Sequence, residues 1–77
     1  MTKAERREVE LCVIDVLSYT RFKTAKEIKE EVNAMLEKQE MSTVSLTDIR
    51  TALSRVERDS RLRKKRGSDS YAYYNVL

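Results

Sequence analysis

The chain has 77 residues, of which 40% are hydrophobic and 38% are charged, and its formal net charge is +3. This length allows a single domain, residues 1–77, and the composition is typical of a soluble, helix-rich globule and not of a disordered chain. The longest apolar runs span three or four residues, so the sequence predicts neither a membrane span nor a signal peptide. One Cys cannot form an internal disulfide, and we expect a cytoplasmic or nucleoid-associated protein.

Charge is distributed unevenly along the sequence. Residues 1–49 carry eight Lys or Arg against ten Asp or Glu, whereas residues 50–77 carry eight against three. A charge polarised in this way orients a molecule toward a polyanion. The alternative, a solvated face that serves only solubility, stays open at this point.

Three capped, amphipathic segments predict three helices. Each begins with a hydroxyl residue followed three positions later by an acid, which is the spacing of a helix N-cap: Thr2 and Glu5, Thr24 and Glu27, Ser45 and Asp48. Apolar spacing then predicts helices over about residues 2–19, 24–38 and 45–59. The expected buried residues are Val9, Cys12, Val13, Val16 and Leu17, then Ala25, Ile28, Val32, Met35 and Leu36, then Ile49, Ala52, Leu53 and Val56. Residues 19–23 suit an extended connector or edge strand, residues 39–44 suit a loop, and Asn33 is expected to face water.

Leu11 and Ile14 lie off the buried stripe of the first helix, on roughly its opposite side at about 100° per residue. A helix that is apolar on two sides is either sandwiched within the fold or lends one side to a partner. Leu11 and Ile14 are therefore the candidates for a homodimer contact.

Residues 61–77 predict a β-hairpin with a positively charged tip. Five of the six residues between 61 and 66 are cationic, and they precede a turn at residues 67–70 and an aromatic segment at residues 71–77. Alternation places residues 72, 74 and 76 on one face of the returning strand and residues 71, 73 and 75 on the other. We expect Leu62, Tyr74 and Val76 to cover the helices, with Tyr73 competing for that position.

The outward face of the third predicted helix carries hydroxyl and Arg side chains. Small hydroxyls permit a close approach to a groove, and Arg can reach guanine edges or phosphates. The candidate DNA contacts on this helix are Thr47, Arg50, Thr51, Ser54, Arg55 and Arg58, and those on the hairpin are Arg63, Lys64, Lys65, Arg66 and Ser68. We expect the cations of both elements to form one continuous face.

The order helix, short extended segment, helix, helix and basic hairpin resembles the winged helix-turn-helix family of DNA-binding domains. Residues 24–28 are similar to the start of the family's second helix, residues 46–58 to its recognition helix, and residues 63–68 to the tip of its wing. The resemblance implies a mainly α fold with a small β-hairpin (α+β), a recognition helix in the major groove, and a wing on the backbone or minor groove. So compact a chain also resembles small regulators of viruses or mobile elements.

We therefore expect a sequence-specific double-stranded DNA-binding protein that regulates transcription as a homodimer. The alternative is a winged-helix protein–protein interaction module in which the Arg patch meets an acidic partner surface. The lack of His and of a Gly-rich phosphate loop, with Cys12 on a core stripe, predicts no catalysis, no metal and no cofactor. We expect no small-molecule ligand and no membrane partner, and the operator sequence stays open.

Overall fold

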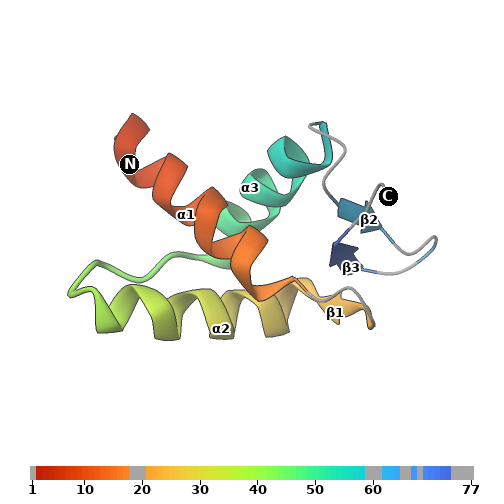
Figure 1. The fold of residues 1–77 in the computed structure, drawn as a ribbon, viewed down its shortest axis with the longest axis horizontal. Coiled ribbons are helices and arrows are strands. Elements are labelled where there is room, and N and C mark those ends of the chain that lie inside the picture. Colours follow the sequence, from red (N-terminus) through yellow and green to blue (C-terminus); the bar gives the residue numbers. More distant parts are fainter. Residues whose placement is uncertain (1, 18–20, 59–61, 65–66, 68, 74–77) are drawn as a thin grey trace.

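A computed structural model describes residues 2–17, 21–58, 62–64, 67 and 69–73, with only the backbone of Tyr73. The elements are α1 (Lys3–Val16), β1 (Lys23–Thr24), α2 (Ala25–Lys38), α3 (Leu46–Arg58), β2 (Leu62–Lys64) and β3 (Ser70–Tyr73). Figure 1 shows α1 and α3 above α2, with the three strands gathered at one end of the molecule. The described part of the chain is thus mainly α with a small sheet, as the sequence predicts. None of its helices is long and apolar enough to cross a bilayer.

Hydrogen-bonded caps start all three helices at the positions predicted from the sequence. Both halves of the capping box form at Thr2 in α1 and at Thr24 in α2. Before α3, the Ser45 hydroxyl accepts from the Asp48 N–H at 3.2 Å, and the Asp48 carboxylate accepts from the Ser45 N–H at 3.2 Å. Each cap satisfies N–H groups that have no partner within the first turn.

α1 ends at Val16, earlier than the predicted residue 19. Leu17 already has an extended backbone, and its side chain turns into the core. The carbonyls at a helix end lack intrahelical partners, and that of Val16 accepts a hydrogen bond from Lys23 Nζ at 2.7 Å. The same ammonium donates to Glu31 at 2.9 Å, so Lys23 links β1 to both α1 and α2. Residues 18–20 lie outside the described part of the chain.

The core lies where the three helices meet, and all three predicted stripes contribute to it. Val16 and Met35, which were expected inside, are partly buried at its edge. Leu62 and Tyr71 extend the core onto the sheet. The largest fully buried side chains are those of Ile28, Leu36, Ile49, Leu53, Val13, Val32 and Cys12.

The three strands form one antiparallel sheet in the order β1–β3–β2. Lys23 of β1 and Lys64 of β2 both lie opposite Tyr71 of the central strand β3. The strand predicted within residues 19–23 therefore exists, but it begins only at Lys23 and pairs with the returning strand of the hairpin. Residues 19 and 20 of the predicted segment lie outside the described part of the chain, and residues 21 and 22 are not part of the strand.

The hairpin contacts the core through Leu62, as predicted, and also through Tyr71, which was not expected there. Residues that lie opposite each other in an antiparallel pair share a face, and Tyr71 shares its face with Lys64 and hence with Leu62. Leu62 and Tyr71 are 5% and 6% exposed and belong to the core, and Ala72, on the other face of β3, is buried as well at 1% exposed. The pairing of Lys64 with Tyr71 determines which residues of β3 share a face with Leu62. Tyr74, Val76 and the side chain of Tyr73, which the prediction also concerned, lie outside the described residues.

The loop between α2 and α3 is held by Asn33. Its side-chain nitrogen donates to the Val44 carbonyl at 3.1 Å, and its Oδ1 accepts from the Val44 N–H at 2.8 Å. The prediction that Asn33 faces water is therefore wrong. An amide side chain carries both a donor and an acceptor, so it can pair with both main-chain groups of one residue.

Candidate functional site

The six residues predicted to contact DNA from the third helix all lie on its exposed side. Ile49 and Leu53 bury the opposite side of α3 and set this orientation. The Thr51 hydroxyl donates to the Thr47 carbonyl at 3.0 Å, so its proton is bonded within the helix. The exposed residues are Thr47, Arg50, Thr51, Ser54, Arg55 and Arg58.

Asp69 joins the hairpin to two helices. Its carboxylate accepts hydrogen bonds from Arg50 Nη2 of α3 at 2.8 Å and from the Tyr71 hydroxyl at 3.4 Å. Its main-chain carbonyl accepts from the N–H of Ala25, the first residue of α2, at 2.9 Å. The hydrogen bond to Asp69 raises the pKa of Arg50, and burial together with Asp69 raises the pKa of Tyr71. Arg50 therefore holds the hairpin beside α3, with part of its charge offset by Asp69.

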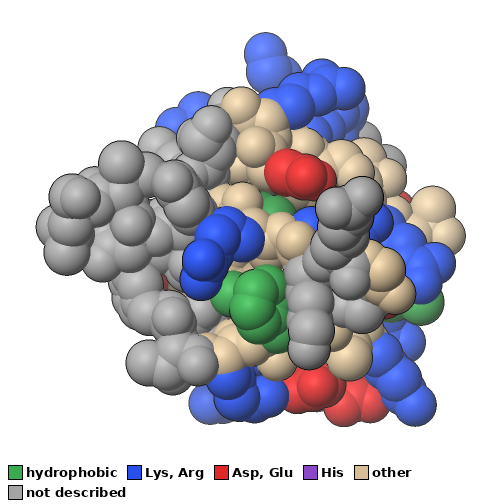
Figure 2. Space-filling model, turned by 90° about the vertical axis from the view of Figure 1, so that its right-hand side faces the viewer, with side chains coloured by type: hydrophobic (Ala, Val, Ile, Leu, Met, Phe, Trp, Pro, Cys, Tyr) green, Lys and Arg blue, Asp and Glu red, His purple; other side chains and the backbone are tan. Residues whose placement is uncertain are grey.

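The two described cations of the hairpin, Arg63 and Lys64, lie on different faces of the sheet. The Arg63 guanidinium carbon is 5.8 Å from the centroid of the Phe22 ring, and Lys64 Nζ is 5.9 Å from that of Tyr71. Figure 2 views the sheet end of the molecule, where the coloured Lys and Arg atoms form several patches with acidic atoms between them. The other predicted hairpin contacts, Lys65, Arg66 and Ser68, lie outside the described residues.

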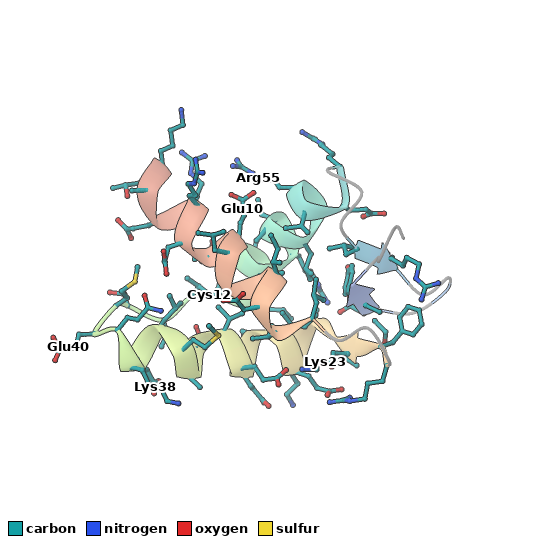
Figure 3. All side chains as sticks on the ribbon, viewed as in Figure 1. Glu10, Cys12, Lys23, Lys38, Glu40 and Arg55 are labelled. Atoms are coloured by element: carbon teal, nitrogen blue, oxygen red, sulfur yellow. The ribbon has the colours of Figure 1, made fainter. Side chains whose placement is uncertain are left out.

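A groove of about 710 Å³ runs between α1 and the C-terminal half of α3. Figure 3 shows Glu10 of α1 and Arg55 of α3 projecting into the space between the two helices. The apolar residues that line the groove are Ala4, Leu11, Ile14 and Val56, and the charged ones are Lys3, Arg6, Arg7, Glu10 and Arg55. Four cations and one acid thus surround an apolar lining.

A smaller hollow of about 80 Å³ adjoins this groove toward the start of α3. It shares Arg6, Glu10 and Arg55 with the groove, Val9 and Ala52 supply its apolar lining, and Asp48 adds a second acid. The two hollows therefore form one continuous surface feature, which we call the α1–α3 groove.

Leu11 and Ile14, the predicted dimer contacts, both line the α1–α3 groove. Leu11 is 48% exposed, and Ile14 is half-buried against the core. Of the two explanations for a second apolar side on α1, sandwiching within the fold is therefore wrong for Leu11. Its side chain offers apolar surface on the outside of the described molecule.

Arg50 and Arg55 leave α3 on different flanks. Five residues of helix separate them by about 140°, and Arg50 binds the hairpin whereas Arg55 lines the groove with α1. Arg50 and Arg55 thus contact different neighbours, and Lys65 and Arg66 of the expected basic face lie outside the described residues. The sequence analysis missed Lys3 and Arg7, although they recur with Leu11 at every fourth position and so share one side of α1.

The thiol of Cys12 lies in the core of the molecule. Cys12 is 2% exposed, and its burial, followed by the charges of Glu8 and Asp15, raises the pKa of its thiol. A protonated, inaccessible thiol is a poor nucleophile. In the parts of the chain that the structure describes, no group of three or more acidic or Cys side chains is arranged to hold a metal ion.

Comparison with known proteins identifies the fold. No protein-family model and no curated protein matches the sequence. Among solved structures, the chain is similar to one described as "A Dual E3 Mechanism for Rub1 Ligation to Cdc53: Dcn1(P)-Cdc53(WHB)". The match covers 97% of this chain and 96% of that chain, with a TM-score of 0.71 and 18% sequence identity. At this identity the likeness establishes the fold, which is a winged helix.

Proposed function

We propose that this winged-helix chain is a protein-docking module that binds an acidic partner surface through the α1–α3 groove. The observation that carries the proposal is the combination of exposed apolar side chains, Leu11 above all, with a rim of Lys and Arg. Buried apolar area supplies most of the affinity of a protein interface, and complementary charge orients the partner and speeds association. A nucleic acid backbone would use the cations and leave Leu11 without a partner.

The structural comparison supports a protein partner. The similar structure names Cdc53(WHB) together with a second protein, Dcn1(P). A fold of this shape and size therefore occurs in the company of a protein partner in at least one case. In the present chain, this fold carries a groove lined by Lys and Arg side chains.

Double-stranded DNA binding by the outward face of α3 is the second candidate. The observation that favours it is that Thr47, Ser54 and Arg58 are all exposed on this face. In this arrangement α3 enters a major groove, and the hairpin, held by the Arg50–Asp69 ion pair, lies along the phosphates. Sequence-specific transcriptional regulation, and a homodimer on a two-fold operator, belong to this candidate.

Two parallel selections distinguish the candidates. The immobilised chain is offered a library of random peptides and, separately, a pool of random short DNA duplexes, at the same ionic strength. Two variants are compared with the wild type. Leu11→Glu alters the groove, Arg58→Glu alters the outward face of α3, and each serves as the control for the other.

The docking proposal expects enrichment of peptides that combine Asp or Glu with apolar residues. Their binding is lost with Leu11→Glu and retained with Arg58→Glu. Enrichment of duplexes that survives Leu11→Glu and is lost with Arg58→Glu establishes the DNA candidate instead. A peptide pool that binds the wild-type chain and Leu11→Glu equally well contradicts the use of the groove.

A further inference from the structure

We infer that the segment bound by the α1–α3 groove is an acidic, amphipathic α-helix of a partner protein, lying along α1. This inference rests on the docking function proposed above and specifies the class of partner. Three features carry it: the helical walls of the groove, the spacing of its apolar residues, and its charge.

The walls of the groove favour a helical occupant. Its described lining residues all belong to α1 or α3, whose main-chain groups are bonded within each helix. An extended peptide lying there would lose water from its own N–H and C=O groups without gaining partners, at a cost of about 1–3 kcal/mol for each unsatisfied group. A helix satisfies these groups internally, so it can bury one face in the groove at no such cost.

The apolar residues of α1 match the spacing of a short helix. Ala4, Leu11 and Ile14 line the groove over a rise of about 15 Å, so about three turns of a partner helix span them. Apolar residues at i, i+3 or i+4, and i+7 on that helix would meet this row. The adjoining hollow, lined by Val9 and Ala52, is of a size to take the end of one anchoring side chain.

The charges of the groove favour an acidic helix. Lys3 and Arg6 lie in or next to the first turn of α1, where the positive end of the helix dipole disfavours cations, and the last turn of α1 holds no basic residue. Both helices have an acid in the first turn, Glu5 in α1 and Asp48 in α3, but only α3 also has basic residues in its last turn, where the dipole favours them. The cations of α1 are therefore placed against the stability of their own helix. Attraction to carboxylates on a partner accounts for this placement.

The same charges disfavour a second copy of the chain as the occupant. In a two-fold contact the same patch of each copy faces the other, and here each side would bring four cations and two acids to the contact. Opposed like charges destabilise such a contact, most strongly at low ionic strength. The carboxylates of an acidic helix would instead attract these cations.

The test uses two synthetic helical peptides with the same length and the same Leu positions. One carries Glu and the other Lys at the outward positions next to the apolar stripe, and circular dichroism confirms that both are helical. Each is labelled with a dye and titrated with the full chain while fluorescence anisotropy is measured. We expect the Glu peptide to bind, the Lys peptide not to bind, and the affinity of the Glu peptide to fall as salt is added.

Variants of the chain locate the binding site. We expect Leu11→Glu, Arg7→Glu and Arg55→Glu each to weaken binding of the Glu peptide by about tenfold or more. Lys26→Glu is the matched control, because Lys26 is an exposed cation on α2 that does not line the groove. Its affinity for the Glu peptide is expected to stay near that of the wild type.

Each contrary outcome has its own meaning. Equal binding of the Lys and Glu peptides, or an unchanged affinity in Arg7→Glu, overturns the acidic-helix inference. Library peptides that bind the groove in an extended conformation overturn it too, but leave the docking function standing. If no library peptide binds, both fail. If the chain alone sediments as a dimer and Leu11→Glu makes it monomeric, the groove belongs to a second copy.

Discussion

Lys23 is a nearly buried cation whose hydrogen bonds connect three elements. Its side chain is 12% exposed, and it donates to the Val16 carbonyl and to Glu31. A buried charge is tolerated when it is paired and its donors are used. The residue is therefore part of the scaffold and not of a binding surface, although its type alone would suggest the reverse.

Replacing Lys23 with Met tests this role. We expect Lys23→Met to lower the free energy of unfolding by about 1–2 kcal/mol, because the Val16 carbonyl and Glu31 lose a partner. Urea denaturation followed by circular dichroism measures the change. Lys26→Met, at an exposed position, is the control, and an equal loss in both variants would contradict the anchoring role of Lys23.

The buried thiol of Cys12 gives a pH dependence of known sign. Its pKa is raised in the folded state, so the stability associated with the neutral thiol is present below the unfolded value of 9.0 and is lost as the pH rises through the folded value. We expect the difference in unfolding free energy between the wild type and Cys12→Ala to shrink above pH 9.0. A difference that stays constant across this range would show that the thiol does not titrate differently on folding.

At the scale of elements, the α2–α3 loop depends on one amide. Asn33→Ala leaves both main-chain groups of Val44 without their side-chain partner, and we expect a loss of about 1–3 kcal/mol in unfolding free energy. Asn33→Asp keeps an acceptor for the Val44 N–H and is expected to lose less. Chemical denaturation measures the stability of the two variants. Equal stability of Asn33→Ala and the wild type would show that the hydrogen bonds between Asn33 and Val44 contribute nothing to the free energy of unfolding.

The start of α2 has an acid-sensitive cap. The hydrogen bond from Arg21, followed by that from the Thr24 backbone, lowers the pKa of Glu27 from its usual 4.5. Because the folded pKa is the lower one, this stabilisation is present above the unfolded value and is lost as the pH falls through the folded value. We expect Glu27→Gln to be less stable than the wild type at neutral pH, with the gap closing below pH 4.5. Glu30→Gln, at an exposed position of α2, controls for the loss of one charge.

Helix starts and buried stripes were predictable because the residues that determine them are close together in the sequence. A cap involves residues three apart, and a stripe repeats within each turn. The end of α1 depends on Lys23, which lies beyond the helix, and the phase of the hairpin depends on the pairing of Lys64 with Tyr71. Neither contact leaves a local signal, so the end of α1 was predicted too late and the burial of Tyr71 was not predicted.

At the scale of the whole molecule, the sequence indicated which residues were unusual but not how they are grouped. Leu11 was identified as an apolar residue off the core stripe, and Arg55 as a cation of α3. Their meeting in one groove depends on how α1 packs against α3, which are far apart along the chain. The winged-helix fold itself was predictable, because the order of its elements is a property of the chain.

The charge of the groove predicts the behaviour of the chain in isolation. We expect it to sediment as a monomer of 9.1 kDa at low ionic strength, because self-association through the groove would bring like charges together. Added salt screens this repulsion, so any weak association should increase with ionic strength. Sedimentation equilibrium over a salt series measures this, and a dimer that forms at low salt and dissociates as salt is added would contradict it.

Asp69 has a consequence for protein engineering. Its carboxylate and carbonyl contact α3 and α2, so the angle of the hairpin is set partly by residues outside it. A designer who grafts a foreign loop onto this scaffold must transfer Arg50 and Asp69 as a matched pair. A graft that changes only one of them removes the link to α3, and the hairpin is then positioned by its pairing with β1 and by the burial of Leu62 and Tyr71 alone.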